Sequence, residues 1–194
     1  MNEATPRGDL VRLQLPARRN ALASLTVGDE VLLSGPVFTA RDATHERLLE
    51  ALARDGELPF GLAGATLFYA GPTPPAAGRP VGSVGPTTAR RMDAATPALQ
   101  RAGIVATIGK GARSAAVREA CIETGSVYFA AVGGAAALLA THVVSAETVA
   151  WPELGTEALV RLELVGFPVF VAIDTRGGGL YESARRTFPG EAKR

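Results

Sequence analysis

The chain has 194 residues, and 47% of them are apolar, which is enough for one domain with a substantial core. Its 20 Lys and Arg residues nearly balance its 19 Asp and Glu residues, so the charge gives no reason to expect a nucleic-acid partner. The single cysteine, Cys121, excludes an internal disulfide framework and a cysteine-ligated iron–sulfur or zinc site within the chain. The two histidines, His45 and His142, argue against a multi-histidine metal site.

No segment has the pattern of a membrane anchor. Residues 1–8 are polar and lack the apolar stretch of a signal peptide. The low-charge run at 126–144 contains two adjacent glycines and His142, so it fits a strand, a turn and a buried helix better than a membrane span. We therefore expect a cytoplasmic protein without membrane contact.

Local patterns in the first third of the chain predict strands and one clear helix. Alternation of apolar and polar residues is typical of a strand, and a Gly after the last turn typically ends a helix. On this basis we expect a strand at 10–15, a polar break at 18–20, a strand at 31–35, a loop at 36–40, and a helix from Asp42 to about residue 54 that buries Leu48, Leu49 and Leu52.

The rest of the chain alternates strands and helices in its middle and becomes strand-rich toward its end. We expect strands at 65–70, 103–108, 127–132, 143–149, 159–165 and 168–173, and helices at 112–124 and 135–140, with a Pro- and Gly-rich loop at 71–85. A further helix is expected to start at Thr87-Thr88 and to reach residue 101, with a kink or second start at Thr96-Pro97. This order predicts an α/β domain with a mixed sheet and packed helices at 21–182, preceded by a lead-in at 1–20 and followed by a polar, frayed tail at 183–194.

The stretch at 84–93 is the strongest candidate for a binding site. A helix that starts on Thr87 and Thr88 would direct unpaired amide groups and the positive end of its dipole toward a ligand. Arg91 follows Thr87 by four residues and can lie on the same face. A small anion such as a carboxylate or phosphate is the natural ligand, and an ordinary capped helix with solvated arginines is the alternative.

Two other polar groups also follow predicted strands. The segment Gly109-Lys110-Gly111 resembles part of a P-loop, but its spacing is wrong and Gly111 replaces the magnesium-binding hydroxyl residue, so nucleotide binding is the weaker interpretation. Lys110 would still lie at the carboxyl edge of the sheet, where ligands bind, or else be a plain exposed lysine. Arg41 could bind a carboxylate, with Asp42 and His45 in the first turn of the following helix, or these residues simply begin a helix that packs the histidine.

The remaining polar residues have ordinary structural interpretations. Glu153 and Glu157 are expected to be surface carboxylates, Asp174 a turn former, and Cys121 a small core residue. Arg41, Thr87, Arg91 and Lys110 would then form one strongly cationic site with few acids, which favours a dianion.

The motifs together resemble the β subunit, equivalently the C-terminal domain, of class I iron–sulfur fumarate hydratases and L(+)-tartrate dehydratases. The matching segments run in order from about residue 25 to 182: Leu32-Leu33-Ser34-Gly35 with Arg41-Asp42-Ala43-Thr44-His45, Tyr69-Ala70-Gly71-Pro72, Gly85-Pro86-Thr87-Thr88 through Arg91-Met92-Asp93, Ile108-Gly109-Lys110-Gly111, Val132-Gly133-Gly134-Ala135-Ala136, Glu153-Leu154-Gly155 with Glu157-Ala158, and Phe167-Pro168 with Ile173-Asp174. The Gly-Pro-Thr-Thr…Arg-Met-Asp and Ile-Gly-Lys-Gly pair is specific, whereas either part alone would be weak. Arg90 departs from the pattern, which has a small residue there.

The resemblance implies a swivelling β/β/α domain and a hydro-lyase for a C4 dicarboxylate, either fumarate and malate or L-tartrate and oxaloacetate. It implies a [4Fe–4S] cluster ligated by a separate α subunit, and no metal bound by this chain alone. By the same resemblance Thr87 is the proton-abstracting residue with Arg91 beside it, and Arg41 and Lys110 contact substrate carboxylates. Asp42, His45, Thr88, Gly109 and Gly111 would support them.

Two alternatives remain open at this stage. The chain could be a free-standing domain that binds an anion or a partner protein without catalysis, or, less well supported, a nucleotide-binding domain. The choice between fumarate and tartrate is also open. An apolar face that awaits the α subunit is expected, so the isolated chain could form a homodimer.

Overall fold

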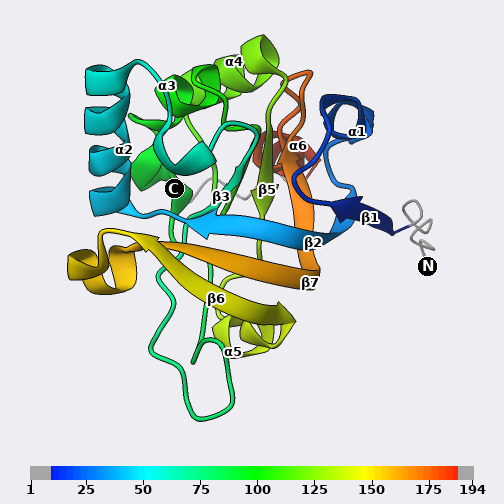
Figure 1. The fold of residues 1–194 in the computed structure, drawn as a ribbon. Helices are drawn as coiled ribbons and strands as arrows, with labels where there is room; N and C mark the ends of the chain where they lie inside the picture. Colours follow the sequence, from blue (N-terminus) through cyan, green and yellow to red (C-terminus); the bar gives the residue numbers. More distant parts are fainter. Residues whose placement is uncertain (1–9, 188–194) are drawn as a thin grey trace, which may run out of the picture.

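The computed structural model describes residues 10–187, which form one mixed sheet with helices packed against it (Figure 1). The strands are β1 Val11–Gln14, β2 Glu30–Thr39, β3 Thr66–Phe68, β4 Ala106–Gly109, β5 Val127–Ala130, β6 Val143–Ala150 and β7 Leu159–Ile173. The α-helices are α1 Arg19–Ser24, α2 Asp42–Asp55, α3 Thr96–Arg101, α4 Ala115–Thr124, α5 Ala136–Leu139 and α6 Leu180–Thr187. Short 3₁₀ turns occupy Pro59–Gly61, Ala89–Met92, Ala140–His142 and Pro152–Glu157. The expected mixed α/β class is confirmed.

The sheet has the order β1-β2-β3-β4-β5-β7-β6, and β7 also pairs with β2. The neighbours from β1 to β5 are parallel, whereas β7 runs antiparallel to β2, β5 and β6. Because β7 joins β5 to β2, the strands β2, β3, β4, β5 and β7 close into a ring. The carboxyl ends of the parallel strands therefore meet at one edge of this ring.

The two faces of the sheet bury separate sets of apolar side chains. Successive residues of a strand point to opposite faces, and in β3 this places Phe68 in one cluster and Leu67 in the other. The second cluster lies beneath α2, α3 and α4, which bury Leu48, Leu99 and Val117 against the sheet. These helices cover the same side of the ring in Figure 1.

Several expected elements differ from the structure. Residues 36–39 belong to β2 rather than to a loop, and 159–165 and 168–173 are one strand, because β2 pairs with both halves of β7 from Glu30↔Phe170 to Thr39↔Val160. The expected polar break at 18–20 leads into α1, and the first part of the expected tail, 183–187, belongs to α6. The expectations for residues 1–8 and 188–194 lie outside the described residues. Within 10–187, no helix has the length and apolarity needed to cross a membrane.

Candidate functional site

Thr87 and Lys110 lie next to each other at the carboxyl edge of the ring. The Thr87 amide donates to the Tyr69 carbonyl just after β3 (2.6 Å), and the Lys110 amide donates to the Thr87 carbonyl (3.1 Å). The Ala89 amide in turn donates to the Lys110 carbonyl (2.9 Å), so the segment at 87–89 runs beside the end of β4 like a short strand. Thr87 is half-buried and Lys110 is exposed, so neither lies behind the core.

The expected α-helix at Thr87-Thr88 does not form. Only a 3₁₀ turn, Ala89–Met92, follows Thr88, and the Thr88 side chain makes no capping hydrogen bond. The backbone of Thr88 pairs with Lys110 instead, and the helix α3 begins later, with Pro97 in its first turn. A helix dipole directed at a ligand from Thr87 is therefore not part of this site.

Gly109 allows this segment to cross the end of β4 so closely. A Cβ atom on Gly109 would lie 2.9 Å from the Ala89 Cβ and 2.9 Å from a ring carbon of Tyr69. Any side chain at 109 would push the Thr87 segment away from the strand, because packed interiors do not yield by such distances without cost.

Both candidate arginines are already paired with carboxylates, which corrects the expectation of a site with few acids. Arg91 makes a bidentate pair with Asp42, with Nε to Oδ1 at 3.0 Å and Nη2 to Oδ2 at 2.6 Å. Arg41 Nη2 lies 3.2 Å from Glu157 Oε1. Within residues 10–187, Lys110 has no ion-pair partner. Of the three candidate cations, its ammonium is therefore the one that no carboxylate balances.

Glu157 is a functional candidate that the sequence did not reveal. It is half-buried rather than a surface carboxylate, and its Oε2 accepts the Ala43 amide of the first turn of α2 at 2.9 Å. The Thr44 hydroxyl donates to the Glu157 carbonyl. A carboxylate is favoured at a helix N-terminus, so Glu157 is fixed there and holds Arg41 in turn. No local pattern links residues so far apart in the sequence.

His45 is packed behind Arg41 rather than exposed to the edge. Its side chain is buried, its ring meets that of Tyr69 edge-on at 5.2 Å, and Nδ1 lies 2.8 Å from the Arg41 carbonyl. Since a carbonyl only accepts, Nδ1 carries the proton, and Nε2 has no hydrogen-bond partner within residues 10–187. Burial lowers the pKa of His45 to about 4, despite the opposing effect of the bond to Arg41. His45 is therefore neutral at physiological pH and supports the backbone of Arg41.

The loop that carries Lys110 is held on both sides of Gly111. The Gly111 amide donates to Tyr181 Oη of α6 (3.1 Å), and Tyr128 Oη donates to the Gly111 carbonyl (2.8 Å). Burial raises the pKa of Tyr128, so its hydroxyl stays protonated as this bond requires. The aliphatic stem of Lys110 lies over Gly133, where a Cβ would be 3.3 Å from the lysine Cδ.

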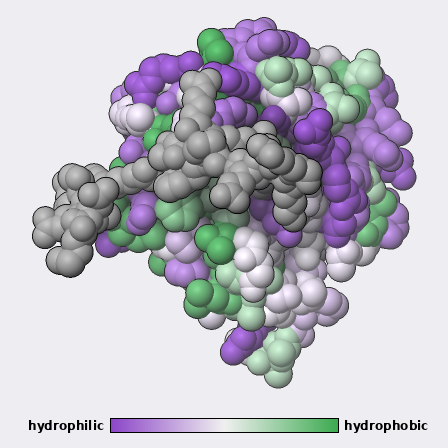
Figure 2. Space-filling view, turned by 180° about the vertical axis from the view of Figure 1, so that it is seen from behind, coloured by the Kyte–Doolittle hydropathy of each residue, from purple (hydrophilic) through white to green (hydrophobic). Residues whose placement is uncertain are grey.

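Several large apolar side chains on and around α5 are exposed. Val132, Leu138, Val144 and Val165 have exposed fractions of 56%, 63%, 56% and 56%. Leu138 lies in α5, Val132 in the loop before it, Val144 in β6 and Val165 in β7. From behind, pale and hydrophobic side chains gather over the lower part of the molecule, where α5 and the loop after β3 lie, while the upper part is mainly hydrophilic (Figure 2).

The described residues do not provide ligands for a metal cluster. Between residues 10 and 187, no three His, Cys, Asp or Glu side chains gather where they could hold a metal ion. Cys121 is fully buried, accepts a hydrogen bond from Gln100 Nε2 at 3.4 Å, and has its pKa raised by burial. It behaves as the core residue that the sequence predicted. Asp174 is likewise the expected turn former, since its Oδ1 accepts the amides of Arg176 and Gly178.

Comparison with known proteins assigns the family. Residues 2–184 match the family described as fumarase C-terminus. The chain belongs to the fumarase C-terminus family. It is 38% identical over 163 residues to the anaerobic class I fumarate hydratase of Escherichia coli strain K12, covering 83% of this chain and 30% of that protein. This chain thus spans about a third of the length of the fumarate hydratases it matches.

Two tartrate dehydratase subunits match this chain along most of their length. The chain is 38% identical over 168 residues to the putative L(+)-tartrate dehydratase subunit beta of Methanocaldococcus jannaschii, covering 84% of this chain and 86% of that protein. It is 34% identical over 181 residues to the L(+)-tartrate dehydratase subunit beta of Escherichia coli strain K12, covering 91% and 89%. In size this chain therefore corresponds to the β subunits.

Proposed function

We propose that this chain is the β subunit of a hydro-lyase that adds water to, or removes it from, a C4 dicarboxylate. The observation that carries the proposal is the family match over nearly the whole chain, with Thr87 and Lys110 joined by backbone hydrogen bonds at one sheet edge. The correspondence in length with the tartrate dehydratase β subunits supports a separate subunit of swivelling β/β/α type.

The partner in this proposal is an α subunit that ligates a [4Fe–4S] cluster. This chain offers only one cysteine, and that thiol is buried and hydrogen-bonded, so the cluster ligands must come from elsewhere. When bound in the complex, such a cluster supplies Lewis acidity to the hydroxyl that is lost or gained. Val132 precedes the glycine that lies beneath Lys110, and we place the contact with the α subunit on the exposed apolar side chains of Val132, Leu138, Val144 and Val165.

Thr87 is proposed to take the proton from the carbon next to a substrate carboxylate. Its backbone is fixed at both ends by Tyr69 and Lys110, and its hydroxyl has no hydrogen-bond partner within residues 10–187, so it is free to face substrate. A threonine hydroxyl is a weak base at its ordinary pKa. The guanidinium of Arg91 in the next turn and the ammonium of Lys110 would favour its ionised form, because opposite charge stabilises an anion.

Arg41 and Lys110 are proposed to bind the substrate carboxylates and to stabilise the charge that develops when the proton leaves. Arg41 keeps Nη1 outside its pair with Glu157, and Arg91 keeps Nη1 outside its pair with Asp42. The carboxylate partners hold both guanidinium planes in place before substrate arrives, which reduces the ordering needed at binding.

The test is turnover of fumarate and of L-tartrate by the chain co-expressed with a cluster-bearing α subunit. Thr87→Val keeps the shape of the side chain but removes the hydroxyl, and we expect it to lower kcat by about 10²–10⁴-fold, as loss of a general base does. Thr87→Ser retains the hydroxyl, and Thr148→Val is the matched control on an exposed threonine of β6, outside the site. Unimpaired turnover by Thr87→Val would remove the assignment of the base.

The same experiment separates this proposal from a binding domain without catalysis. If the assembled complex binds fumarate or L-tartrate but turns over neither, the chain is an anion-binding domain and the hydro-lyase proposal fails. The ratio of the two turnover rates identifies the substrate.

A further inference from the structure

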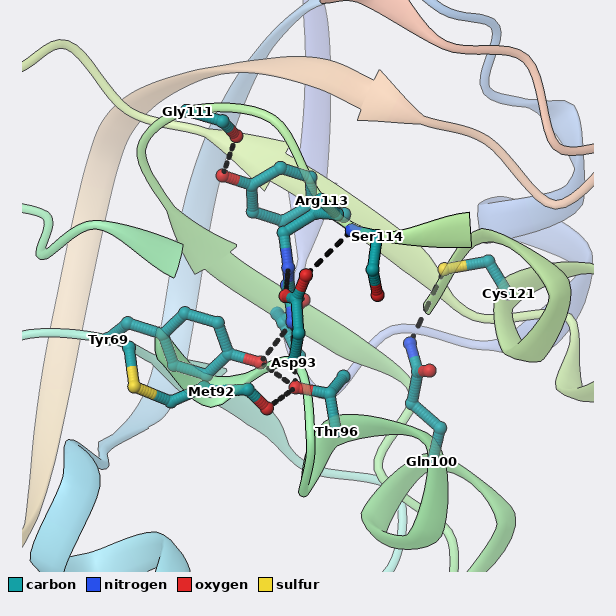
Figure 3. A network of polar contacts seen from close by, with 11 residues as sticks. Tyr69, Met92, Asp93, Thr96, Gln100, Gly111, Arg113, Ser114 and Cys121 are labelled. Carbon is teal, nitrogen blue, oxygen red and sulfur yellow. Dashed lines mark hydrogen bonds and ion pairs between the residues drawn. The ribbon is translucent and has the colours of Figure 1, made fainter. Parts of the chain in front are cut away.

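Arg113 has a fully buried guanidinium at the centre of a polar network beneath the site (Figure 3). Its side chain is 0% exposed, and its Nε donates to Asp93 Oδ1 at 2.6 Å. Nη2 donates to the Thr96 hydroxyl at 2.7 Å, and the guanidinium lies over the rings of Tyr69 and Tyr128, 5.2 and 4.9 Å from their centroids. No local pattern singled out this residue, which follows the Gly-Lys-Gly segment inside a run of small residues.

A buried charge of this kind is not a requirement of stability. Desolvation of an ion pair often cancels the gain from its attraction, and apolar residues of similar volume can replace buried pairs without loss. A fixed guanidinium instead orients its partners, because its N–H groups point in fixed directions and each acceptor must lie along one of them. The question is therefore which parts of the molecule Arg113 orients.

Arg113 contacts each of the three segments that carry the candidate site. It lies over Tyr69, whose carbonyl holds the Thr87 amide. It binds Asp93, which ends the turn that contains Arg91. The same carboxylate accepts the Ser114 amide at 2.6 Å, which ties the turn to the loop between Lys110 and α4.

We propose that Arg113 is a positioning residue that fixes the distance between Thr87 and Lys110 and the orientation of Arg91. It does not touch substrate, because it is fully buried and its donors are directed to Asp93, Thr96, Tyr69 and Thr107. This inference rests on the proposed function, since the three residues it positions are those proposed to act on the dicarboxylate.

The experiment uses Arg113→Lys and Asp93→Asn in the complex with the α subunit. Lysine keeps the positive charge but cannot reach Asp93 and Thr96 at once, and asparagine keeps the shape of Asp93 but weakens the pair. We expect kcat/KM for the substrate that the wild type turns over to fall by about 10²-fold, as a displacement of about 1 Å in a site can cause. The matched control is Arg101→Lys, which alters an exposed bidentate pair with Glu123 between α3 and α4.

A second measurement does not depend on turnover. Hydrogen exchange of the full chain reports the amides of Thr87, Ala89 and Lys110, which bond the segment at 87–89 to Tyr69 and to Lys110. We expect these amides to exchange at least about tenfold faster in Arg113→Lys and Asp93→Asn, while amides of β5 and β7 keep their rates.

The outcomes separate the two proposals. Faster exchange at these amides with reduced kcat/KM supports the positioning role. A lower unfolding midpoint with unchanged kcat/KM and unchanged exchange at Thr87 and Lys110 overturns it, because Arg113 then only stabilises the fold. If the wild-type complex turns over neither substrate, the proposed function fails, and the exchange rates still decide whether Arg113 positions the two segments.

Discussion

Replacing His45 by Asn should flatten the pH dependence of folding stability below neutral pH. His45 is buried, and its pKa in the folded chain is about 4 against 6.5 for an exposed histidine. Asparagine can still donate to the Arg41 carbonyl from its amide, in place of Nδ1 at 2.8 Å. The variant thus removes the titrating group while it keeps the hydrogen bond that anchors Arg41.

The magnitude follows from proton linkage. Because the pKa is lowered on folding, the unfolded chain binds a proton at His45 that the folded chain rejects, and stability is lost as the pH falls from 6.5 toward 4. With these two pKa values the free energy of unfolding decreases by about 2 kcal/mol between pH 7 and pH 5, at about 1.2 kcal/mol per pH unit in the steepest part. His45→Asn should lack this contribution, although it loses packing against Tyr69 at every pH.

Urea unfolding of the isolated chain between pH 8 and pH 5 measures the effect, with the fluorescence of Trp151, the one tryptophan, as the signal. The quantity of interest is the difference in unfolding free energy between wild type and variant, which should shrink by about 2 kcal/mol from pH 7 to pH 5. His142→Asn, which removes the other histidine, is the matched control. Parallel profiles for wild type and His45→Asn would refute the reasoning, since His45 would then accept a proton in the folded chain as readily as in the unfolded one.

Three further outcomes follow from the contacts around the site. Gly109→Ala places a Cβ 2.9 Å from that of Ala89, so we expect the free energy of unfolding, measured in urea, to fall by about 1–3 kcal/mol. An unchanged urea midpoint would contradict this expectation. Tyr181→Phe removes the hydroxyl that accepts the Gly111 amide, so the free energy of unfolding should fall by about 1 kcal/mol and the Gly111 amide should exchange faster. An exchange rate equal to that of the wild type would show that α6 does not hold the loop. Glu123→Gln breaks only an exposed ion pair on α4, and we expect the thermal unfolding midpoint to stay the same, in contrast to Asp93→Asn.

Elements whose signals are local were predictable from the sequence. The helix α2 was found from the spacing of its apolar residues and from Gly56, which adopts the left-handed conformation after its last turn. The alternation of strands and helices between residues 65 and 140 indicated parallel packing, and Arg41 and Lys110 were each expected just after a strand. In the structure these strands are β2 and β4, which are separated by β3. Family motifs supplied the roles of these residues, which stay predictions until the variants are assayed.

The helix expected at Thr87 shows where local signals failed. Two threonines followed by arginines fit a helix start, but the backbone of Thr88 pairs with Lys110, and the glycine at 109 lets the segment approach. A cap contributes only about 1 kcal/mol, and several hydrogen bonds to a strand outweigh it. A partner that lies more than twenty residues away is not visible in the local sequence.

By itself the sequence determined the class of fold, the family and the chemical types that gather at one sheet edge, because periodicity, turn residues and motifs are properties of neighbouring positions. Only the tertiary structure decided the electrostatic state of the site. Among the residues that the structure describes, it pairs Arg41 with Glu157 and Arg91 with Asp42, leaves Lys110 without a carboxylate partner, buries His45 in its neutral form and places Arg113 between the segments. Charge pairing and burial depend on which residues meet in space, and closure of the ring by β7 brings together residues that no local pattern connects.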